Sequence, residues 1–260
     1  MQRRQTDRKL YFKELAVTSE KYFVPYIKKY IELGPETKVL EIGCGDGGNL
    51  LPLAKMGCSV LGCDISATRI NDAIKFFKEE GVSADFVASD VFLLEGLEKQ
   101  FDLIICHDVI EHISDKYDFM SKCQRLLKPQ GVLFVSFPAW QMPFGGHQQI
   151  CRGRILSHLP FFHLFPSGIY RKILQIGGES EGCIKELLSI KETRCPIELF
   201  HSVLDRLGCY ETINRVGWFI NPHYEIKFGL KPRKINKLID KIPYIRDFFT
   251  TSSFYILKLK

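Results

Sequence analysis

Short apolar runs alternate with amphipathic segments along the first half of the chain. The apolar runs predict five strands, which lie within Val39–Ile42, Val60–Ser66, Asp85–Val91, Phe101–Ile113 and Leu126–Pro138. Apolar residues recur at helical spacing in the segments between them, at Asn49–Met56, Ala67–Glu80 and Ser114–Leu127. Strands that alternate with helices in this way pair in parallel through right-handed crossovers. The pattern therefore predicts an α/β fold with a mostly parallel sheet.

The second half of the chain adds two strands and two insertions. Alternating apolar and polar residues predict strands at Tyr210–Ile220 and Ser253–Leu259, with a helix at Ile197–Leu207 before them. Apolar pieces broken by prolines and glycines fill Trp140–Cys195, which we interpret as a helical lid. A second insertion, Asn221–Thr250, is rich in lysine and aromatic residues. The chain thus divides into a core with its N-terminal helices, a lid, and the end of the core, at residues 1–139, 140–196 and 197–260, with the second insertion at 221–250.

The segment before the first strand is predicted to be helical. Leu10–Leu33 carries aromatic and aliphatic residues mostly at helical spacing, and Pro25 either breaks this run or opens a second helix. Residues 1–9 are polar, and we expect them to fray. The N-terminus has basic residues but neither an apolar core nor a cleavage site of small residues, so we predict no signal peptide.

Composition narrows the class of protein. A chain of 260 residues with 45% hydrophobic and 25% charged residues suits one globular α/β domain with a cap. No apolar run approaches the ~18 residues that a membrane-spanning helix needs. The nine cysteines form no C-x-x-C pair. An odd number of thiols, several on predicted buried strands, indicates free cysteines in a reducing cytoplasm.

Positive charge gathers at the C-terminal end of the chain. From His223 to Lys260 there are nine Lys and Arg against three Asp and Glu, a balance equal to the net charge of +6. Such a basic surface is either simply solvated or attracts an acidic substrate, an anionic membrane surface or nucleic acid. The core segments show no basic stripe interleaved with aromatic residues and no RNA-binding module, so nucleic acid is not the expected partner.

A glycine-rich loop follows the first predicted strand and leads into a helix. Gly43, Gly45 and Gly48 match the pattern G-x-G-x-x-G, in which backbone N–H groups approach a ligand, although this pattern alone is a weak signal. Glu41 at the strand end and Asp46 inside the loop argue against a dinucleotide, because they would repel a pyrophosphate and the loop has no basic partner for it. A cationic ligand without phosphate suits the loop better. S-adenosylmethionine, with its sulfonium and ammonium groups, is such a ligand.

The segment Val39–Gly48 resembles motif I of the class I S-adenosylmethionine-dependent methyltransferases, and the order of elements matches that family from Lys38 to Pro138. Asp64 ends the second strand, at the ~20-residue spacing from the glycine-rich loop at which an acid binds ribose hydroxyls. Asp90 fits the acid that bonds the adenine amino group in this family. The resemblance implies a Rossmann-like, doubly wound, mostly parallel sheet of seven strands whose last strand is antiparallel. The residues that it places at the cofactor are Glu41, Gly43, Cys44, Gly45, Gly47, Asp64, Ile65, Asp90, Val91 and His107.

Titratable residues cluster after the fourth strand, in the run His107-Asp108-Val109-Ile110-Glu111-His112. If Asp108 opens a helix, Glu111 and His112 lie on the same face at i+3 and i+4. Alternatively, Asp108 is the N-cap of that helix and Glu111 is its capping-box partner. Class I methyl transfer is an in-line displacement at the sulfonium methyl. Such groups would therefore position the nucleophile and remove its proton.

A metal site is a more specific hypothesis for this cluster than acid–base chemistry alone. His147 follows the fifth strand, and two carboxylates and two imidazoles could hold one divalent cation, with Asp108, Glu111, His112 and His147 as ligands and Zn, Mn, Fe, Co or Mg as the metal. The arrangement is similar to the Glu-x-x-Glu-His segment of the ubiquinone-pathway O-methyltransferases and of the small-RNA 2′-O-methyltransferases, with Asp108 where they have glutamate. The competing hypothesis makes His112 or His147 a general base, with Asp108 only capping the helix.

These residues together predict a cytoplasmic S-adenosylmethionine-dependent methyltransferase that acts on a small molecule at an oxygen atom. An RNA 2′-O-methyltransferase and a cofactor-binding scaffold without turnover are the alternatives. The lid and the second insertion are expected to cover the carboxyl edge of the sheet and to bind an apolar or ring-containing acceptor. The aromatic residues expected there are Phe144, Phe161, Phe162, Phe165, Tyr170, Trp218 and Phe228. His158 and His163 of the lid are expected to be surface or packing residues rather than ligands.

Overall fold

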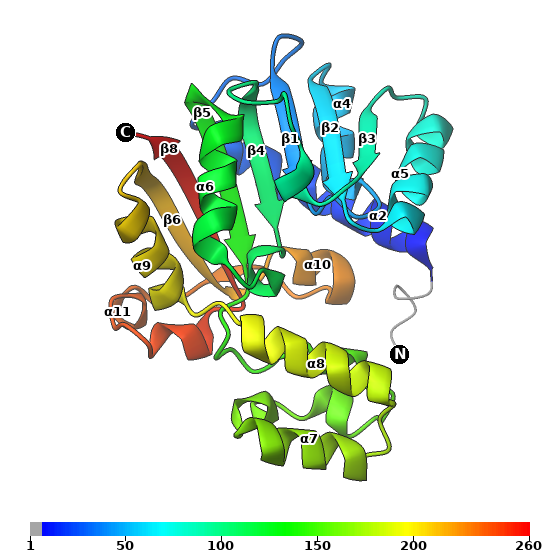
Figure 1. Cartoon of the computed structure of the whole chain (residues 1–260), viewed down its shortest axis with the longest axis vertical. Coiled ribbons are helices and arrows are strands. Elements are labelled where there is room, and N and C mark those ends of the chain that lie inside the picture. Colours follow the sequence, from blue (N-terminus) through cyan, green and yellow to red (C-terminus); the bar gives the residue numbers. More distant parts are fainter. Residues whose placement is uncertain (1–6) are drawn as a thin grey trace.

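One mixed sheet runs through the core of the protein. The computed structural model describes residues 7–260, and these form eight strands in the order β3-β2-β1-β4-β5-β8-β6-β7 (Figure 1). The strands are β1 Lys38–Ile42, β2 Ser59–Asp64, β3 Asp85–Ala88, β4 Phe101–His107, β5 Leu127–Phe137, β6 Tyr210–Ile220, β7 Arg233–Lys234 and β8 Ser252–Leu259. The pairs among β1 to β5 are parallel, and β8 is antiparallel to both of its neighbours, β5 and β6.

This strand order confirms the predicted mostly parallel α/β sheet with an antiparallel last strand. The strand count differs, because β7 adds a two-residue strand that pairs with β6 at Trp218 and Ile220. A strand of two residues is too short to show alternation in the sequence. β6 has the predicted bounds, whereas β3 ends at Ala88, and a 3₁₀ turn at Val91–Leu93 replaces its predicted end.

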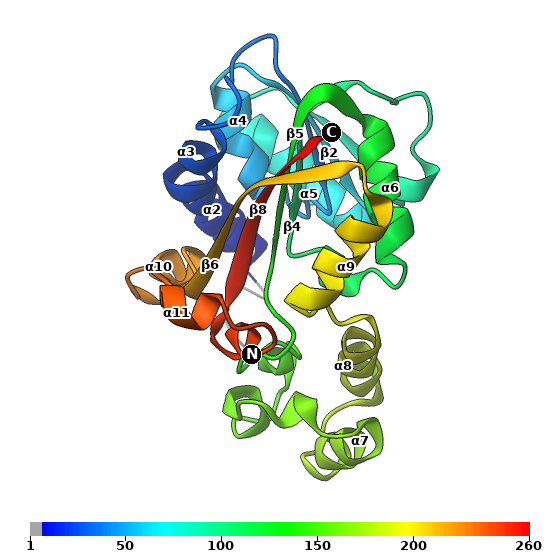
Figure 2. The ribbon, with the colours of Figure 1, turned by 90° about the vertical axis from the view of Figure 1, so that its left-hand side faces the viewer.

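Helices cover both faces of the sheet (Figure 2). One face is covered by α2 Arg8–Thr18, α3 Val24–Ile27, α4 Leu51–Lys55 and α5 Ala67–Glu80, and the other by α6 Lys116–Leu126 and α9 Ile197–Leu207. Along β4, Leu103 and Ile105 pack on the first face, and Ile104 and Cys106 pack on the second. Both faces are apolar because a parallel sheet is buried on both sides. For this reason the parallel strands appear in the sequence as continuous apolar runs.

The segment before β1 is helical, as predicted, but its winding changes once. α2 begins at Arg8, and the side chain of Asp7 accepts a hydrogen bond from the Leu10 N–H at 2.9 Å. A π-helical turn, Ser19–Phe23, follows α2 and continues without a break into α3, near whose start Pro25 lacks the N–H for a helical bond. The predicted fraying is wrong for residues 7–9, which cap and open α2. Its remaining part, residues 1–6, lies outside the described residues.

Two segments lie beyond the carboxyl ends of the parallel strands, toward which the arrowheads point in Figure 1. Residues 140–195 form 3₁₀ turns followed by α7 Ser167–Ile176 and α8 Glu181–Thr193, and they enclose a small apolar cluster of their own. Residues 221–250 hold α10 His223–Phe228, β7 and α11 Lys237–Asp240. α10 packs against α2, with the Thr18 hydroxyl 2.7 Å from His223 Nδ1. Both segments therefore lie at the sheet edge that also carries the glycine-rich loop.

Two expectations from composition concern cysteines and membranes. All nine cysteines lie within residues 7–260, and each carries a free thiol there. Over the same residues, no helix is both long enough and apolar enough to cross a membrane. The cytoplasmic location and the division of the chain into three parts stay predictions.

Candidate active site

Glycines shape the loop between β1 and α4. Gly43, Gly45 and Gly47 have φ angles of 70°, 53° and 81°, which residues with a side chain rarely adopt. A Cβ at Gly43 would lie 2.3 Å from Cγ2 of Val109, so this glycine also lets the segment after β4 come close. The Gly43 N–H donates to the Cys63 carbonyl at 2.8 Å, which ties the loop to β2. The loop is therefore fixed between the ends of β2 and β4.

Asp64 organises the end of β2. Its two carboxylate oxygens accept hydrogen bonds from the N–H groups of Gly45 and Ser66, each at 2.8 Å. Since each oxygen keeps a second lone pair, the carboxylate can still accept from a pair of hydroxyls. Asp90 is exposed beyond the end of the neighbouring strand β3, and its carboxylate accepts from the Phe92 N–H at 3.0 Å. Asp64, the last residue of β2, and Asp90, two residues past β3, thus lie at the ends of adjacent strands.

Three further residues predicted to contact the cofactor lie next to these acids or in the glycine-rich loop. Ile65, next to Asp64, is 81% exposed, which leaves its apolar surface available to a ligand. Val91, next to Asp90, is buried in the core, and Cys44 is buried within the loop. The predicted cofactor contacts of Val91 and Cys44 would therefore be made through the backbone more than through the side chain.

A buried carboxylate lies beneath the loop. Glu41 is 1% exposed, and Asn49 Nδ2 donates to its Oε1 at 2.7 Å. Its Oε2 has no hydrogen-bond partner among the residues that the structure describes. Burial raises the pKa of Glu41 to about 8. An acid with an acceptor oxygen left over suits an N–H donor or a cationic group of a ligand.

Asp46 does not face a ligand. Its carboxylate is fully buried and forms an ion pair with the Arg8 guanidinium of α2. The Arg69 guanidinium of α5 approaches the loop from another side, where it would lie 2.9 Å from a Cβ at Gly45. The argument against a dinucleotide from Asp46 and from the lack of a basic partner is therefore wrong, because α2 and α5 supply arginines. Glu41 is the acid that still disfavours a phosphate at the loop.

His107 ends β4, and the next residue, Asp108, is its hydrogen-bonded partner. The buried His107 ring packs edge-on against Phe23, and its Nδ1 lies 3.0 Å from the Ser136 hydroxyl and 3.1 Å from Asp108 Oδ1. Asp108 has a positive φ of 53°, and the helix that follows is a single 3₁₀ turn, Ile110–His112, whose N-cap is the residue after Asp108. Asp108 therefore neither opens nor caps a helix. Both predicted placements are wrong, because the left-handed backbone turns the chain before the helix begins.

Three of the four predicted metal ligands converge. Glu111, His112 and His147 each place one ligand atom within 4.8 Å of the other two, and we call them the Glu–His–His cluster. Glu111 Oε1 lies 4.0 Å from Nε2 of both histidines. Asp108 lies beside the cluster, with its carboxylate bonded to His107. Tertiary structure has thus joined residues from the loops after β4 and β5.

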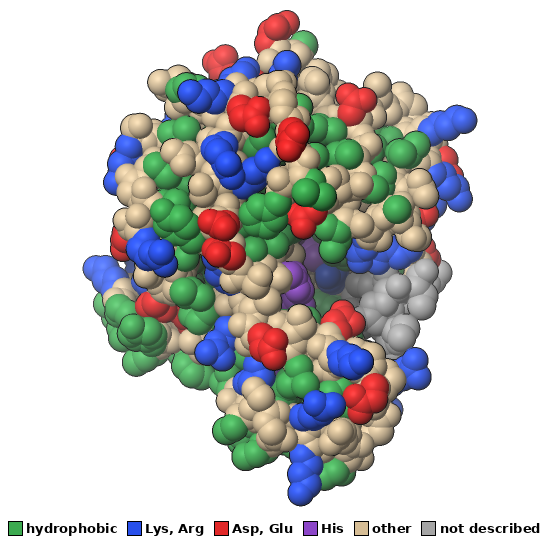
Figure 3. Space-filling view, in the orientation of Figure 1, with side chains coloured by type: hydrophobic (Ala, Val, Ile, Leu, Met, Phe, Trp, Pro, Cys, Tyr) green, Lys and Arg blue, Asp and Glu red, His purple; other side chains and the backbone are tan. Residues whose placement is uncertain are grey.

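Close packing behind the cluster brings His147 into place. A Cβ at Gly145 would lie 2.1 Å from the Trp140 carbonyl oxygen, and one at Gly146 would lie 2.3 Å from Cβ of His163. The turn before His147 therefore needs both glycines. The Thr193 hydroxyl at the end of α8 donates to the Glu111 carbonyl at 2.7 Å, so the lid holds the other side of the cluster. Figure 3 shows histidine side chains within a hollow between the core and the lid.

Burial sets the protonation states in the cluster. Glu111 is 4% exposed, and neither of its carboxylate oxygens has a hydrogen-bond partner within residues 7–260. Burial, together with the charge of Asp108, raises the pKa of Glu111 well above its usual value. Burial also lowers the pKa of His112, and burial with the nearby His112 lowers the pKa of His147 to about 4. Both imidazoles are therefore neutral at pH 7, beside a buried acid.

This donor set fits a divalent cation. Two neutral imidazoles and a carboxylate are ligands of Zn²⁺ and similar metals, and a cation would compensate the buried charge of Glu111. The same groups also fit acid–base chemistry, because an imidazole with a free lone pair can take a proton from a hydroxyl. Both hypotheses place the reacting oxygen next to the same three side chains.

α2 and α10 place further titratable residues near Asp108, which the sequence pattern did not indicate. Burial first, and the charge of Asp108 second, raise the pKa values of Tyr11 and Tyr224 to about 12, and Lys227 also interacts with Asp108. Their local sequence signals were weak. Tyr11 belongs to a run of aromatics at helical spacing that is typical of core packing, and α10 lies in a segment interpreted as an insertion. Tertiary packing, which the sequence pattern does not reveal, places them at the site.

Of the seven aromatic residues expected at an acceptor pocket, Phe144 is half-buried, and the other six fall into two groups. Phe162 and Tyr170 pack against each other inside the lid, with ring centroids 5.1 Å apart, so they stabilise the lid rather than line a pocket. Trp218 packs against Phe254 in the sheet. The members with exposed rings are Phe161, Phe165 and Phe228.

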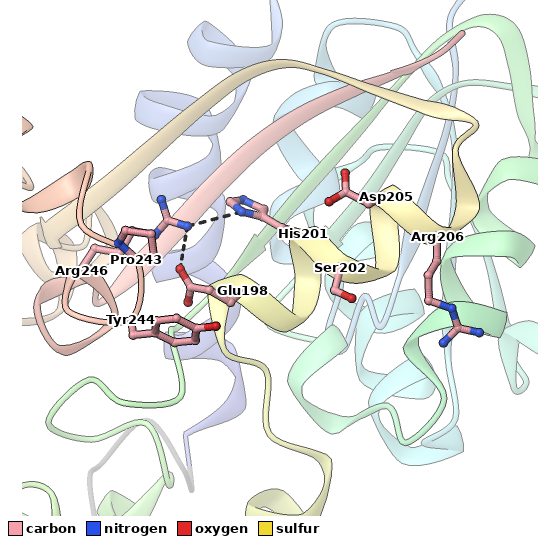
Figure 4. A pocket seen from close by; sticks show the side chains of 8 residues that line it. All are labelled: Glu198, His201, Ser202, Asp205, Arg206, Pro243, Tyr244 and Arg246. Atoms are coloured by element: carbon pink, nitrogen blue, oxygen red, sulfur yellow. Dashed lines mark hydrogen bonds and ion pairs between the residues drawn. The ribbon is translucent and has the colours of Figure 1, made fainter.

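A cavity of about 610 Å³ lies elsewhere, between α9 and the segment before β8 (Figure 4). Its polar side chains already bind one another: Arg246 Nη2 lies 2.7 Å from Glu198 Oε1 and 3.4 Å from His201 Nδ1. His201 Nε2 in turn lies 2.9 Å from the Tyr255 hydroxyl. Of the described residues that line this cavity, none belongs to the predicted cofactor or catalytic set. We therefore interpret it as a structural junction between α9 and the sheet.

Comparison with known proteins shows what the core is similar to. Residues 40–135 match the family model described as Methyltransferase domain. A ubiquinone biosynthesis O-methyltransferase of Chelativorans sp. (strain BNC1) is 41% identical over 99 residues, which cover 38% of this chain and 39% of that protein. The protein of the same name from Bartonella tribocorum (strain CIP 105476 / IBS 506) is 31% identical over 145 residues, which cover 53% and 59%. The chain thus spans only about two to three fifths of the length of these relatives.

A solved structure shares the fold over most of the chain. The PH0226 protein from Pyrococcus horikoshii OT3 superposes with a TM-score of 0.54 at 19% identity, covering 92% of this chain and 89% of that one. At this identity the likeness concerns the fold alone. Because it covers 92% of this chain, it extends well beyond residues 40–135.

Proposed function

We propose a catalytic function from the premise that residues 40–135, which match the family model described as Methyltransferase domain, form a class I S-adenosylmethionine-dependent methyltransferase domain. The chain transfers the methyl group of S-adenosylmethionine to an oxygen atom of a small-molecule acceptor. One observation carries the proposal: the glycine-rich loop locked by Asp64 and the Glu–His–His cluster belong to the same edge of the sheet. A methyl donor and a hydroxyl would meet between them.

The loop side of the site would hold the cofactor. Asp64 would accept from ribose hydroxyls with the lone pairs that its backbone bonds leave free, and Asp90 would accept from the adenine amino group. The unpartnered Oε2 of Glu41 supports a contact with a donor of the methionine portion. The positive φ angles of the glycines let the backbone approach the ligand, and the exposed Ile65 offers an apolar surface for the adenosine.

The cluster side would hold the acceptor. Methyl transfer forms a carbon–oxygen bond while the carbon–sulfur bond breaks, so S-adenosylhomocysteine leaves and the acceptor hydroxyl gives up its proton. His112 and His147 are neutral at pH 7 and can accept that proton. Glu111 can orient the hydroxyl through an oxygen that lacks a partner in the described chain. Asp108 would hold His107 in place through their hydrogen bond.

We further propose that Glu111, His112 and His147 bind a divalent cation, which when bound would lower the pKa of the acceptor hydroxyl and fix its orientation. The support is a buried carboxylate without a partner among residues 7–260, set between two neutral imidazoles. Mixed nitrogen and oxygen ligands favour Zn²⁺, Mn²⁺, Fe²⁺ or Co²⁺ over Mg²⁺. Asp108 would contribute negative charge from beside the cluster rather than a fourth ligand.

The acceptor that we propose is a compound of ubiquinone biosynthesis that is methylated at oxygen. This proposal is based on the names of the two relatives. We call residues 228–249 the basic apolar surface. Their composition supports the proposal that the protein reaches such an apolar compound by binding the cytoplasmic side of an anionic membrane. Its exposed hydrophobic residues are Phe228, Leu230, Leu238, Ile242, Tyr244, Ile245, Phe248 and Phe249. Its exposed basic residues are Lys231, Arg233, Lys234, Lys237 and Lys241. Its two acids are engaged, since Asp240 pairs with Arg215 at 2.7 Å and Asp247 is buried.

The test is a methyl-transfer assay with isotopically labelled S-adenosylmethionine and the purified full-length chain. A panel of hydroxylated benzoates and catechols, with short RNA as a comparison, should give label on a ring hydroxyl and none on RNA. Label on RNA would favour the alternative of an RNA 2′-O-methyltransferase. Turnover that disappears after exhaustive chelation and returns with added Zn²⁺ or Mn²⁺ would support the metal, whereas full turnover after chelation would leave His112 or His147 as a general base.

A further inference from the structure

A second group of potential ligands lies inside the lid, separate from the Glu–His–His cluster. Cys151, Glu179 and Cys183 each place one ligand atom within 4.8 Å of the other two. Cys151 is fully buried, and Glu179 is 8% exposed. The three residues come from different parts of the lid: the segment before α7, the turn between α7 and α8, and the first turn of α8. Folding of the lid has therefore gathered two thiols and an acid in its interior.

The carboxylate of this group is already held in a fixed orientation. Glu179 Oε2 accepts from the Arg152 N–H and Oε1 accepts from the Gly153 N–H, each at 2.9 Å. Carboxylates that bind metals are commonly fixed by hydrogen bonds of this kind. Each oxygen keeps a further lone pair, so Glu179 can bind a cation without losing either backbone bond.

A phenol independently points to a ligand at this place. Tyr170 is 0% exposed, and its hydroxyl has no hydrogen-bond partner in the part of the chain that the structure describes. Tyr170 and Cys151 belong to one packed cluster, against which Cys183 also packs. After burial, the two thiols contribute to a raised pKa of Tyr170. A neutral thiol is a weak acceptor, whereas a thiolate is a strong one. A metal-bound thiolate would therefore provide the partner that the phenol lacks.

We propose that Cys151, Glu179 and Cys183 bind a zinc ion inside the lid. Two thiolates and a carboxylate are established types of zinc ligand, and soft thiolates select zinc over magnesium and calcium. On binding, the two thiols release their protons to solvent, the sulfur atoms bond to the metal, and no electron is transferred. Solvent completes the four ligands that zinc usually takes.

A zinc ion here would stabilise a segment whose own apolar core is small. The buried members of that core are Cys151, Leu156, Phe162, Tyr170, Leu174, Ile184 and Leu187. Small cores supply little stability by themselves, and small folded units commonly add a metal or a disulfide. The end of α8 bonds the Glu111 carbonyl through Thr193, so a firmer lid would also steady the Glu–His–His cluster.

Cobalt substitution tests the proposal on the reduced full-length protein. Thiolate ligands give Co²⁺ a sulfur-to-metal charge-transfer band in the near ultraviolet, which imidazole and carboxylate ligands do not give. We expect this band in the wild type and in Glu111→Gln, which removes a ligand of the other cluster. We expect it to weaken in Cys183→Ser and in Cys151→Ser, and to disappear in the double variant Cys151→Ser with Cys183→Ser. Cys209→Ser, a partly buried cysteine outside the lid, is the matched control and should keep the band.

Thermal unfolding supplies the second measurement. In the Glu111→Gln background, which lacks a ligand of the other cluster, Zn²⁺ should raise the melting temperature. It should do so as well when Cys209→Ser is added, and should have no effect when Cys183→Ser is added. Cys183 is partly exposed, so serine there is compatible with the fold, which circular dichroism checks. The proposal is overturned if the folded, reduced wild type shows no charge-transfer band, if the band survives in the double variant, or if thiol counting finds Cys151 and Cys183 as a disulfide that binds no zinc after reduction.

Discussion

Glu111 is the side chain at which the chemistry of the site can be tested most sharply. Its carboxylate is 4% exposed and has no hydrogen-bond partner within residues 7–260, while two neutral imidazoles lie 4.0 Å from it. Burying an unsatisfied polar group costs about 1–3 kcal/mol, and more when the group is charged. Proteins retain such a group mainly where function needs it. Its energetic cost should therefore be measurable.

Replacing Glu111 by glutamine should stabilise the metal-free protein at neutral pH. A carboxyl whose pKa is raised in the folded state contributes its full stability below its ordinary pKa of 4.5 and loses it as pH rises through the folded pKa. The amide has no charge to lose, so we expect a gain of about 1–3 kcal/mol in unfolding free energy, measured by urea denaturation with a chelator present. Added Zn²⁺ or Mn²⁺ should stabilise the wild type more than Glu111→Gln.

The matched control for this change is Glu192→Gln, an exposed glutamate on α8. It should alter neither the stability nor the response to metal. A Glu111→Gln variant that is less stable than the wild type, or that gains as much from added metal, would contradict the role given to Glu111.

Acid should destabilise the protein through the half-buried His147 and the buried His163. Burial lowers the pKa values of His147 and His163 to about 4 from an ordinary value of 6.5. Their stability contribution is complete above pH 6.5 and declines as pH falls toward about 4, because the unfolded chain takes up the protons first. Each should contribute a slope of up to about 1.4 kcal/mol per pH unit. Urea denaturation of Glu111→Gln at a series of pH values measures the slope without titration of that carboxyl.

Adding His147→Gln to that background should reduce the slope by about half, leaving the contribution of His163. His163 is held inside the lid, with Nε2 2.9 Å from the Trp140 carbonyl oxygen, as expected for a packing residue. An unchanged slope would show that His147 is not buried in its neutral form.

At the scale of elements, α2 and the glycine-rich loop form one unit. Arg8 of α2 pairs with Asp46 of the loop, and the backbone of Phe12 lies directly against Gly48. Asp64 joins the same loop to β2. The cofactor loop is therefore held from two sides, and a change at the contact with α2 should reach the binding site.

Gly48→Ala should weaken that contact. The added Cβ would lie 2.5 Å from the Phe12 carbonyl oxygen and 2.7 Å from Cβ of Leu15, so α2 must move away from the loop. Overpacking of this kind costs about 1–3 kcal/mol of stability, and we also expect several-fold weaker binding of S-adenosylhomocysteine, measured by calorimetry. Gly34→Ala is the control, because its added Cβ would meet nothing within 4 Å in the described chain. Equal behaviour of the two variants would argue against coupling between α2 and the loop.

The elements themselves could largely be predicted from the sequence, because their patterns are local. β6 and α9 have the predicted bounds, and the alternation of strands and helices predicted the parallel sheet. The proximity of His147 to Glu111 could also be predicted, since neighbouring parallel strands end at the same edge of the sheet. The position of Asp108 could not, because a left-handed φ angle at an aspartate leaves no periodic signal. The pairing of Asp46 with Arg8 depends on contact between distant segments, which a motif does not record.

At the scale of the whole molecule, the lid and the second insertion lie at one edge of the sheet (Figure 1). They meet each other, since the rings of Phe161 and Phe248 lie 6.2 Å apart. The basic apolar surface therefore adjoins the lid and the edge where the cofactor loop and the Glu–His–His cluster are found. This arrangement suits an enzyme that takes an apolar acceptor from a membrane surface.

Vesicle flotation tests this proposal. The full-length chain should bind vesicles that contain anionic phosphatidylglycerol and not vesicles of phosphatidylcholine alone, and binding should weaken with salt. The double variant Lys234→Glu with Lys237→Glu should reduce binding several-fold, because it reverses charge within the basic apolar surface. Lys75→Glu with Lys78→Glu, two exposed residues of α5, makes the same charge change elsewhere and should bind as the wild type does. Equal loss in both variants would mean that net charge, and not this surface, governs binding.

The proposed function depends above all on the glycine-rich loop and Asp64 as a site for S-adenosylmethionine. Isothermal titration calorimetry with S-adenosylhomocysteine and with a nicotinamide dinucleotide measures this directly on the wild type and on Asp64→Asn. We expect binding of S-adenosylhomocysteine and none of the dinucleotide, with a loss of about 1–3 kcal/mol in Asp64→Asn because its amide cannot accept on both sides from the ribose hydroxyls. Tight binding of the dinucleotide without any response to S-adenosylhomocysteine would contradict the account.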